Sequence, residues 1–378
     1  MATVTDPNVS IDIHDLRDPS EFMNCNVPEK LNIYANHFFK VMDFNMAEYL
    51  YTRALKIDPT KVNILFNYAN MLEKGRKEYN LAEQCYKEAL RRDPEHVASL
   101  INYGSFLQTI REDYTEAEQM YKRALKVDPD DVDALNNYGH LLKFILKRYE
   151  EAETMYKRCL KVDPYHVSAL NNYGGLLELI KGDYDEAEDM YRRCLDADPD
   201  YVPALSNYGS LLHKVWKKYA LAESMYEKAL EVDPDHVDVL NNYAISLMRN
   251  SEVSVERVLK SKKYATRILE LNPTHTQAIE ILKIISKYES VHGERIERYL
   301  RAQKKSSSAS AGASSSEPIE ISQDAIDKAD EAMRQLLLDE EAEKVMKGKG
   351  TKKSVKNKQV DNENKKIVGG GGKKKKKK

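Results

Sequence analysis

The sequence is poor in the residues and segments that mark several protein classes. Its four cysteines (Cys25, Cys85, Cys159, Cys194) are too few and too scattered for a disulfide framework or a zinc site. No apolar run approaches the roughly 18 residues that a membrane-spanning helix needs. The first residues have neither a basic start nor an apolar stretch, so we expect no secretory signal. These absences predict a soluble protein of the cytoplasm, the nucleus or both.

Catalytic and metal-binding motifs are also missing. The nine histidines are spread singly, and neither HExxH nor a glycine-rich phosphate loop occurs. Paired carboxylates such as Asp130 and Asp131 fall in polar turns, where solvated carboxylates keep ordinary pKa values. Cys159 and Cys194 stand where other repeats place a buried alanine, so they are interpreted as small apolar residues. We therefore expect no enzyme, no metal and no cofactor.

The formal net charge of −2 hides an uneven distribution of charge. Residues Lys344–Lys378 contain 15 lysines against Asp361 and Glu363, a net charge of +13, so the other 343 residues carry −15. A lysine tail without aromatic residues can attract RNA, DNA or an anionic surface weakly and without sequence specificity, through counterion release. It can equally act as a nuclear import signal, or as a solvated tail that folds back on the acidic body.

The chain is dominated by an internal repeat. An Asp-Pro dipeptide recurs every 35 residues, and Asn272-Pro273 follows the last one after 39. Each unit contains two runs of apolar residues at helical spacing, separated by a short polar turn. The prolines of the six Asp-Pro marks are Pro59, Pro94, Pro129, Pro164, Pro199 and Pro234. A helix pair this short buries its apolar stripe only against neighbouring pairs, which predicts a solenoid.

The unit reads L-x2-Y-G-x2-L, then A-x3-Y-x2-A-L-x3-P, as in residues 100–129. It resembles the tetratricopeptide repeat, with the large aromatic residue moved next to the glycine and one extra residue in the turn within the repeat. The resemblance implies an all-α, right-handed superhelical solenoid of about seven helix-turn-helix repeats. A capping helix and a largely disordered basic tail would follow it.

The predicted domain organisation follows changes in composition along the chain. The degenerate end repeats suit caps, and a serine- and alanine-rich stretch separates the solenoid from a second apolar pattern. That pattern places Ile326, Met333, Leu336 and Leu337 on one helical stripe. The predicted segments are an arm (1–27), a solenoid (28–276), a capping helix (277–303), a linker (304–321), an amphipathic helix (322–347) and a disordered tail (348–378).

Asparagine occupies one outward position in six successive repeats. Neighbouring outward positions vary freely: the residue after the glycine site reads Asn70, Ser105, His140, Gly175, Ser210 and Ile245. An exposed asparagine is replaced at little cost, so its persistence needs a cause. The six residues, which we call the asparagine row, are Asn67, Asn102, Asn137, Asn172, Asn207 and Asn242.

Two causes fit the row: hydrogen bonds between repeats, or a bound peptide whose main chain pairs with the amides. First helices roughly 10 Å apart would meet an extended chain about every third residue, holding roughly 15–18 residues. The row is similar to the asparagine ladder in the repeat domain of O-linked N-acetylglucosamine transferase, although no catalytic domain follows. Alanine at Asn137, Asn172 and Asn207 together is then expected to cost less than about 1 kcal/mol.

The sequence therefore predicts a scaffold or adaptor that binds an extended segment of another protein along its inner face. Two alternatives remain open. One is a nuclear or nucleic-acid-associated factor that uses the tail at Lys344–Lys378, and the other is an accessory subunit that presents substrates to a separate enzyme.

Overall fold

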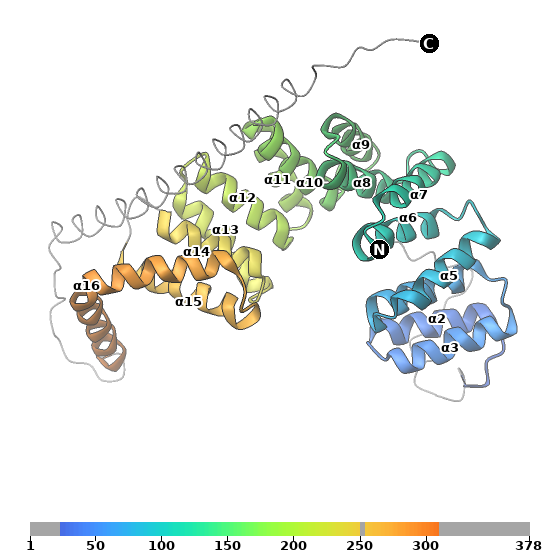
Figure 1. Cartoon of the computed structure of the whole chain (residues 1–378), viewed down its shortest axis with the longest axis horizontal. Coiled ribbons are helices and arrows are strands. Elements are labelled where there is room, and N and C mark those ends of the chain that lie inside the picture. The colour runs from blue at the N-terminus through green and yellow to red at the C-terminus, as the bar shows by residue number, and fades with distance from the viewer. Residues whose placement is uncertain (1–22, 250–253, 310–378) are drawn as a thin grey trace, which may run out of the picture. The chain divides into compact units, whose positions relative to one another are not determined.

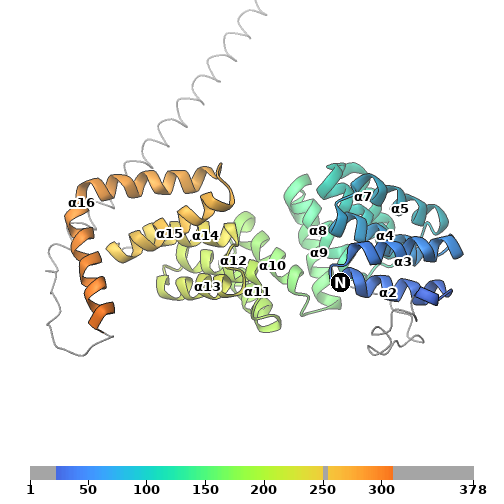
Figure 2. The same ribbon diagram turned by 90° about the horizontal axis from the view of Figure 1, so that it is seen from below.

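The computed structural model describes residues 23–249 and 254–309, all of them in helices and short connections (Figure 1). These residues form two compact units that divide between Asn207 and Tyr208. Within each unit, consecutive helices lie side by side as pairs (Figure 2). The prediction of an all-helical solenoid of paired helices is confirmed.

The N-terminal unit stacks five complete helix pairs. Each helix contacts its partner in the pair, and α3, α5, α7 and α9 also contact the first helix of the next pair. The pairs are α2 (Pro28–Lys40) with α3 (Phe44–Ile57), α4 (Val62–Met71) with α5 (Tyr79–Arg92), α6 (Val97–Phe106) with α7 (Tyr114–Val127), α8 (Val132–Leu141) with α9 (Tyr149–Val162), and α10 (Val167–Leu176) with α11 (Tyr184–Ala197).

The C-terminal unit begins inside α12 (Val202–Lys214) and ends with a long helix, α16 (Thr276–Ala309). Between them lie α13 (Tyr219–Val232), α14 (Val237–Arg249) and α15 (Val255–Leu271). Ala278, Ile281 and Ile285 of α16 join the apolar cluster of α14 and α15, so α16 covers the end of the stack. The helix bends at His292, whose backbone is not helical (Figure 2).

In four of the repeats, the extra residue lies in a π-helical turn. Four first helices end in such a turn, because two successive amides past the turn bond to one leucine carbonyl. The following residue takes a left-handed conformation, with φ of +56° at Lys147 and +71° at Gly182. The turns are η2 (Leu72–Arg76), η3 (Leu107–Arg111), η4 (Leu142–Leu146) and η5 (Leu177–Lys181).

The Asp-Pro marks end the second helices. Each aspartate is extended, as the residue before proline prefers, and its side chain accepts a hydrogen bond from the amide two residues later. The next first helix begins one turn further on, where His96 and His166 cap it through Nδ1. A histidine in this turn thus has a local structural role.

Glycine in the first helix makes room for a tyrosine of the second helix. A Cβ atom placed on Gly139 would lie 2.7 Å from Cε1 of Tyr156, and similar distances hold at Gly104, Gly174 and Gly209. The facing tyrosines Tyr121, Tyr156, Tyr191 and Tyr226 are fully or almost fully buried. The small residue is therefore required by the ring that packs against it.

Several predicted segments lie outside the described residues: the arm up to residue 22, the amphipathic helix at 322–347 and the tail at 348–378. Helix α16 continues through 304–309, residues that the sequence analysis places in the linker. Among residues 23–249 and 254–309, no helix combines the length and the apolar character needed to cross a membrane.

Candidate functional site

The asparagine row lies on the first helices at half-buried positions, between buried tyrosines and small residues. Asn67, Asn102 and Asn137 follow one another on α4, α6 and α8, and Asn172 and Asn207 continue the row on α10 and α12. Asn242 occupies the same position on α14 of the C-terminal unit. None of the six is a core residue, as the helix geometry predicts.

Four asparagines of the row bridge neighbouring repeats through their side chains. In each bridge the Nδ2 amide donates to an asparagine Oδ1 on the preceding first helix, over 2.8–3.1 Å. The bridges run from Asn67 to Asn32, from Asn102 to Asn70, from Asn172 to Asn136 and from Asn207 to Asn171. Hydrogen bonding between repeats, one of the two causes proposed for the row, is therefore present.

The bridges do not use one fixed partner. Asn172 and Asn207 reach the residue just before the preceding member of the row, whereas Asn102 reaches Asn70, three residues after it. Asn137 faces a repeat with Ile101 at the acceptor position. Its Oδ1 accepts a hydrogen bond of 3.3 Å from Nδ2 of Asn136 on the same helix. The asparagine persists even where the bridge is missing.

The buried acceptors Asn136 and Asn171 escaped the sequence analysis. Both are more than nine-tenths buried, as is Asn241, which donates to Gln277 across 2.8 Å. The signal for them was the Asn-Asn dipeptide in these three repeats. Alanine at Asn172 and Asn207 would leave these acceptors unpaired, so we now expect the triple alanine variant to cost more than about 1 kcal/mol.

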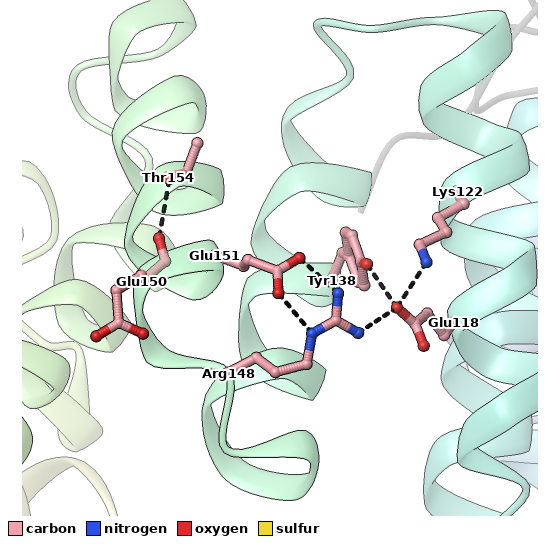
Figure 3. A network of polar contacts seen from close by, with 7 residues as sticks. All are labelled: Glu118, Lys122, Tyr138, Arg148, Glu150, Glu151 and Thr154. Carbon is pink, nitrogen blue, oxygen red and sulfur yellow. Dashed lines mark hydrogen bonds and ion pairs between the residues drawn. The ribbon is translucent and has the colours of Figure 1, made fainter.

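A second row of polar contacts joins the repeats through the tyrosine of the NYG motif. Glu118 of α7 accepts hydrogen bonds from Tyr138 at 2.8 Å and from Arg148 at 2.6 Å, and it pairs with Lys122 (Figure 3). Equivalent clusters centre on Glu48, Glu83 and Glu153. Sequence analysis missed them because the partners are about 20 and 30 residues apart.

The cluster at Glu118 should make the free energy of unfolding depend on pH. Burial raises the pKa of Glu118, but hydrogen bonds from Lys122, Tyr138 and Arg148 outweigh burial and lower that pKa to about 2. Because the folded pKa lies below the unfolded value, the stabilisation is complete above the ordinary glutamate pKa and disappears as pH falls toward 2. Glu118→Gln should therefore lower the free energy of unfolding by roughly 1–2 kcal/mol at pH 7, after solvent screening.

Chemical denaturation of Glu118→Gln and of the unaltered chain at pH 7, 4 and 2 measures this dependence. The difference between the two proteins should shrink toward zero at pH 2, while the exposed-site control Glu150→Gln stays within about 0.5 kcal/mol throughout. A difference that is equal at pH 7 and pH 2 would contradict the role assigned to the Glu118 carboxylate.

Lys143 is a buried cation beside the row. Its Nζ donates to the backbone oxygen of Asn172 at 3.0 Å and occupies the space that a side chain at Gly175 would need. Burial lowers the pKa of Lys143 to about 8, against the attraction of Glu178. The fourth repeat therefore places a buried amine against the backbone of Asn172, one residue of the row.

Sequence models of known families match most of the repeat region. Models of the tetratricopeptide repeat match residues 130–200 and 202–236. The chain is a tetratricopeptide repeat protein. Residues 31–135 of this repeat protein match the model of the cilia and flagella-associated protein 70 middle TPR-like domain. A search among curated proteins found no match.

Solved structures support the same fold. A tetratricopeptide repeat protein from Parabacteroides merdae has 19% identity and a TM-score of 0.52, with 68% of this chain and 98% of that chain covered. PilW, a type IV pilus biogenesis factor, has 20% identity and a TM-score of 0.50, with 58% and 98% covered. At these identities the likeness concerns the fold alone.

The asparagine row offers hydrogen-bonding groups that suit binding of another molecule. In the four bridges, the Nδ2 group of the row residue donates through one N–H, and its second N–H and its carbonyl oxygen are groups that can pair with a peptide. Within the described residues, no group of three or more histidine, cysteine or acidic side chains is arranged to hold a metal ion. Tetratricopeptide repeats are generally non-catalytic and typically mediate contacts between proteins.

Proposed function

We propose that this repeat protein is a non-enzymatic scaffold that holds an extended segment of a partner protein along the asparagine row. The observation that supports it most directly is Asn137. Its amide makes no bridge to a neighbouring repeat within the described residues, yet asparagine is kept there. A role in bridging alone would leave this position free to vary.

The bridges prepare the row for such a ligand. An amide whose Nδ2 already donates to the preceding repeat has a fixed orientation, so binding costs less side-chain entropy. The remaining N–H and Oδ1 can pair with one peptide unit, and repeats roughly 10 Å apart present an amide to about every third residue. Main-chain pairing gives affinity for many sequences, and varied neighbours of the row select among them.

The test compares the full chain with Asn137→Ala, in high salt and after nuclease treatment so that the lysine tail retains no nucleic acid. Partners captured from a lysate are identified by mass spectrometry, and the bound segment is mapped with overlapping peptides. We expect at least a tenfold loss of peptide affinity in Asn137→Ala and only a small decrease in melting temperature, because one 3.3 Å hydrogen bond from Asn136 is lost. Glu150→Ala, an exposed substitution on α9, is the matched control.

Peptides with N-methylated backbone amides distinguish this mode from side-chain recognition. If the row binds main-chain groups, N-methylation of the amides that face it should abolish binding, whereas alanine at the same residues should have little effect. Binding that tolerates N-methylation and is lost on alanine substitution would refute the proposed contact with the row.

The location of the protein in the cell is also part of this proposal. Cytoplasm and nucleus remain our expectation, and the match of residues 31–135 to a cilia and flagella-associated domain adds the cilium as a third place. The nucleic-acid alternative is tested by deleting residues 344–378: if captured RNA disappears while captured proteins persist, RNA binding is a property of the tail alone.

A further inference from the structure

The spacing of the asparagine row restricts the backbone conformation of a segment that binds along it. Within the N-terminal unit, the first helices α4, α6, α8 and α10 contact one another in order, and each carries one member of the row. Adjacent first helices pack with their axes roughly 8–10 Å apart. A main chain that pairs with every amide in the same way must therefore present equivalent groups at this interval.

A β-strand lacks this period, whereas a polyproline II helix has it. Equivalent groups of a strand recur after two or four residues, about 6.6 Å or 13 Å apart, because successive residues face opposite sides. Polyproline II has three residues per turn, so every third residue faces the same way after about 9.3 Å. It also has no internal hydrogen bonds, which leaves its N–H and C=O groups available to the amides of the row.

Two π-helical turns of the N-terminal unit add apolar groups at the same interval. Phe144 and Ile145 on η4 are 41% and 37% exposed, and Leu179 and Ile180 on η5 are 66% and 43% exposed. We call these four residues the apolar patch. The two preceding repeats have a lysine and a threonine at the position of Phe144 and Leu179, so within this unit the patch belongs to the fourth and fifth repeats.

The patch continues the helices that carry the row. Asn137 and His140 lie about one turn apart on α8, and the His140 ring packs on Phe144 with ring centres 4.6 Å apart. In the next repeat, Leu179 follows Asn172 at the same sequence interval as Phe144 follows Asn137. A segment held by the row would therefore meet exposed apolar groups in two successive repeats.

Three basic groups beside the patch are already engaged within the unit. Nζ of Lys143, which lies 4.5 Å from the Phe144 ring centre, donates to the backbone oxygen of Asn172. Arg148 pairs with two glutamates, and Lys181 pairs with a third. Because these charges are balanced locally, the main interaction that the patch offers to a ligand is the burial of apolar surface.

We infer that the N-terminal unit binds a polyproline II segment with a large apolar residue at every third position. The main chain of this segment pairs with the row, and two successive apolar side chains cover the patch. A proline-rich segment holds this conformation before it binds, so it loses little backbone entropy. The pairing with the row rests on the proposed function, whereas the side-chain preference rests on the exposed patch.

Two peptides with blocked ends test the period on the full chain at high salt. The probe consists of four Leu-Pro-Pro triplets, and the control has the same composition with successive leucines two or four residues apart. Both favour polyproline II, but the probe alone presents leucine at every third position. In calorimetric titrations the probe should bind at least about tenfold more tightly, because burial of one leucine supplies such a factor. Equal affinities, or no binding of either peptide at millimolar concentration, would overturn the inference.

A third peptide separates backbone conformation from the spacing of the side chains. Four Leu-Thr-Thr triplets keep leucine at every third position but favour a β-strand, in which leucines of this spacing face opposite sides. This peptide should bind at least about tenfold more weakly than the Leu-Pro-Pro probe, because it must give up its preferred conformation. Equal binding of these two peptides would rule out polyproline II as the recognised conformation.

The contribution of the patch is measured with Phe144→Lys combined with Leu179→Thr. Lysine and threonine are the residues of the two preceding repeats at this position, so the fold should persist. The variant should lose at least about fivefold in affinity for the Leu-Pro-Pro probe. The matched control is Val127→Lys with Val162→Thr, which replaces valines of 41% and 47% exposure at the ends of second helices and should leave binding unchanged. Equal affinities of the patch variant and this control would exclude the patch from the binding site.

Asn137→Ala distinguishes a failure of this inference from a failure of the proposed function. The lost amide should weaken binding of both proline-rich peptides by a similar factor, because both pair through the main chain. If Asn137→Ala changes nothing while the period and the patch still matter, contact with the row is refuted and recognition of the apolar period stands. If Asn137→Ala weakens binding while neither the period nor the patch matters, the inference is refuted and the proposed function stands.

Discussion

Replacing Gly139 with valine should destabilise the N-terminal unit by about 3 kcal/mol or more. A single Cβ atom at this position already lies 2.7 Å, 3.0 Å and 3.1 Å from three atoms of the Tyr156 ring. The ring is fully buried and has no room to retreat, so the methyl groups of valine force the two helices apart. Valine has a better helix propensity than glycine, but that gain is only a few tenths of a kcal/mol.

Thermal and chemical unfolding of Gly139→Val measure the effect. Gly293→Val is the matched control, because no atom lies within 4 Å of a Cβ placed at Gly293. Combining Gly139→Val with Tyr156→Leu should recover part of the loss, since a smaller side chain then faces the valine. A Gly139→Val protein as stable as the control would show that the helices separate at no cost, contrary to the close packing described.

Alanine at both Asn172 and Asn207 should lower the free energy of unfolding by about 2–5 kcal/mol. Each substitution removes the donor of a buried asparagine oxygen, on Asn136 and Asn171, and an unpaired buried acceptor costs about 1–3 kcal/mol. Asn137→Ala removes the acceptor of a longer hydrogen bond, 3.3 Å, from the buried Asn136 amide, so its cost should be about 1 kcal/mol.

The matched rescue removes the acceptor as well. Asn136→Ile introduces the residue that the third repeat has at the equivalent Ile101, and replacing both partners of a hydrogen bond by apolar groups is nearly neutral. Adding Asn136→Ile to Asn172→Ala should therefore restore most of the lost stability in urea unfolding. If the double variant is no more stable than Asn172→Ala alone, the bridge is not the source of the loss.

The paired helices were predictable because their signals are local and repeated. Apolar spacing, the Asp-Pro stops and the glycine of the NYG motif each act within one repeat, and seven copies reinforce one another. The outward position of the asparagine row followed from helix periodicity alone. In contrast, the sequence predicted one extra residue between the two helices of a repeat but not the π-helical turn. Composition does not reveal to which carbonyl oxygen a backbone amide donates its hydrogen bond.

The contacts between repeats could not be predicted in the same way. The hydrogen bonds from Asn172 to Asn136 and from Arg148 to Glu118 join residues 30 or more positions apart in the sequence. They form only once the repeats are stacked. An outward position on an isolated helix becomes half-buried once the next helix packs beside it. Helical periodicity predicts the direction in which a side chain points. Its hydrogen-bond partner depends on the residues of the neighbouring repeat.

The π-helical turns also bear on how such an array changes in length. Since η2 to η5 insert the additional residue at the same place in four successive repeats, these blocks of 35 residues share one register. A block removed or duplicated between equivalent positions keeps the separation between Arg148 and Glu118 and the cap after each Asp-Pro. Gain or loss of a whole repeat therefore preserves the contacts between repeats. A one-residue deletion in a single turn shifts that repeat relative to both neighbours and disturbs these contacts.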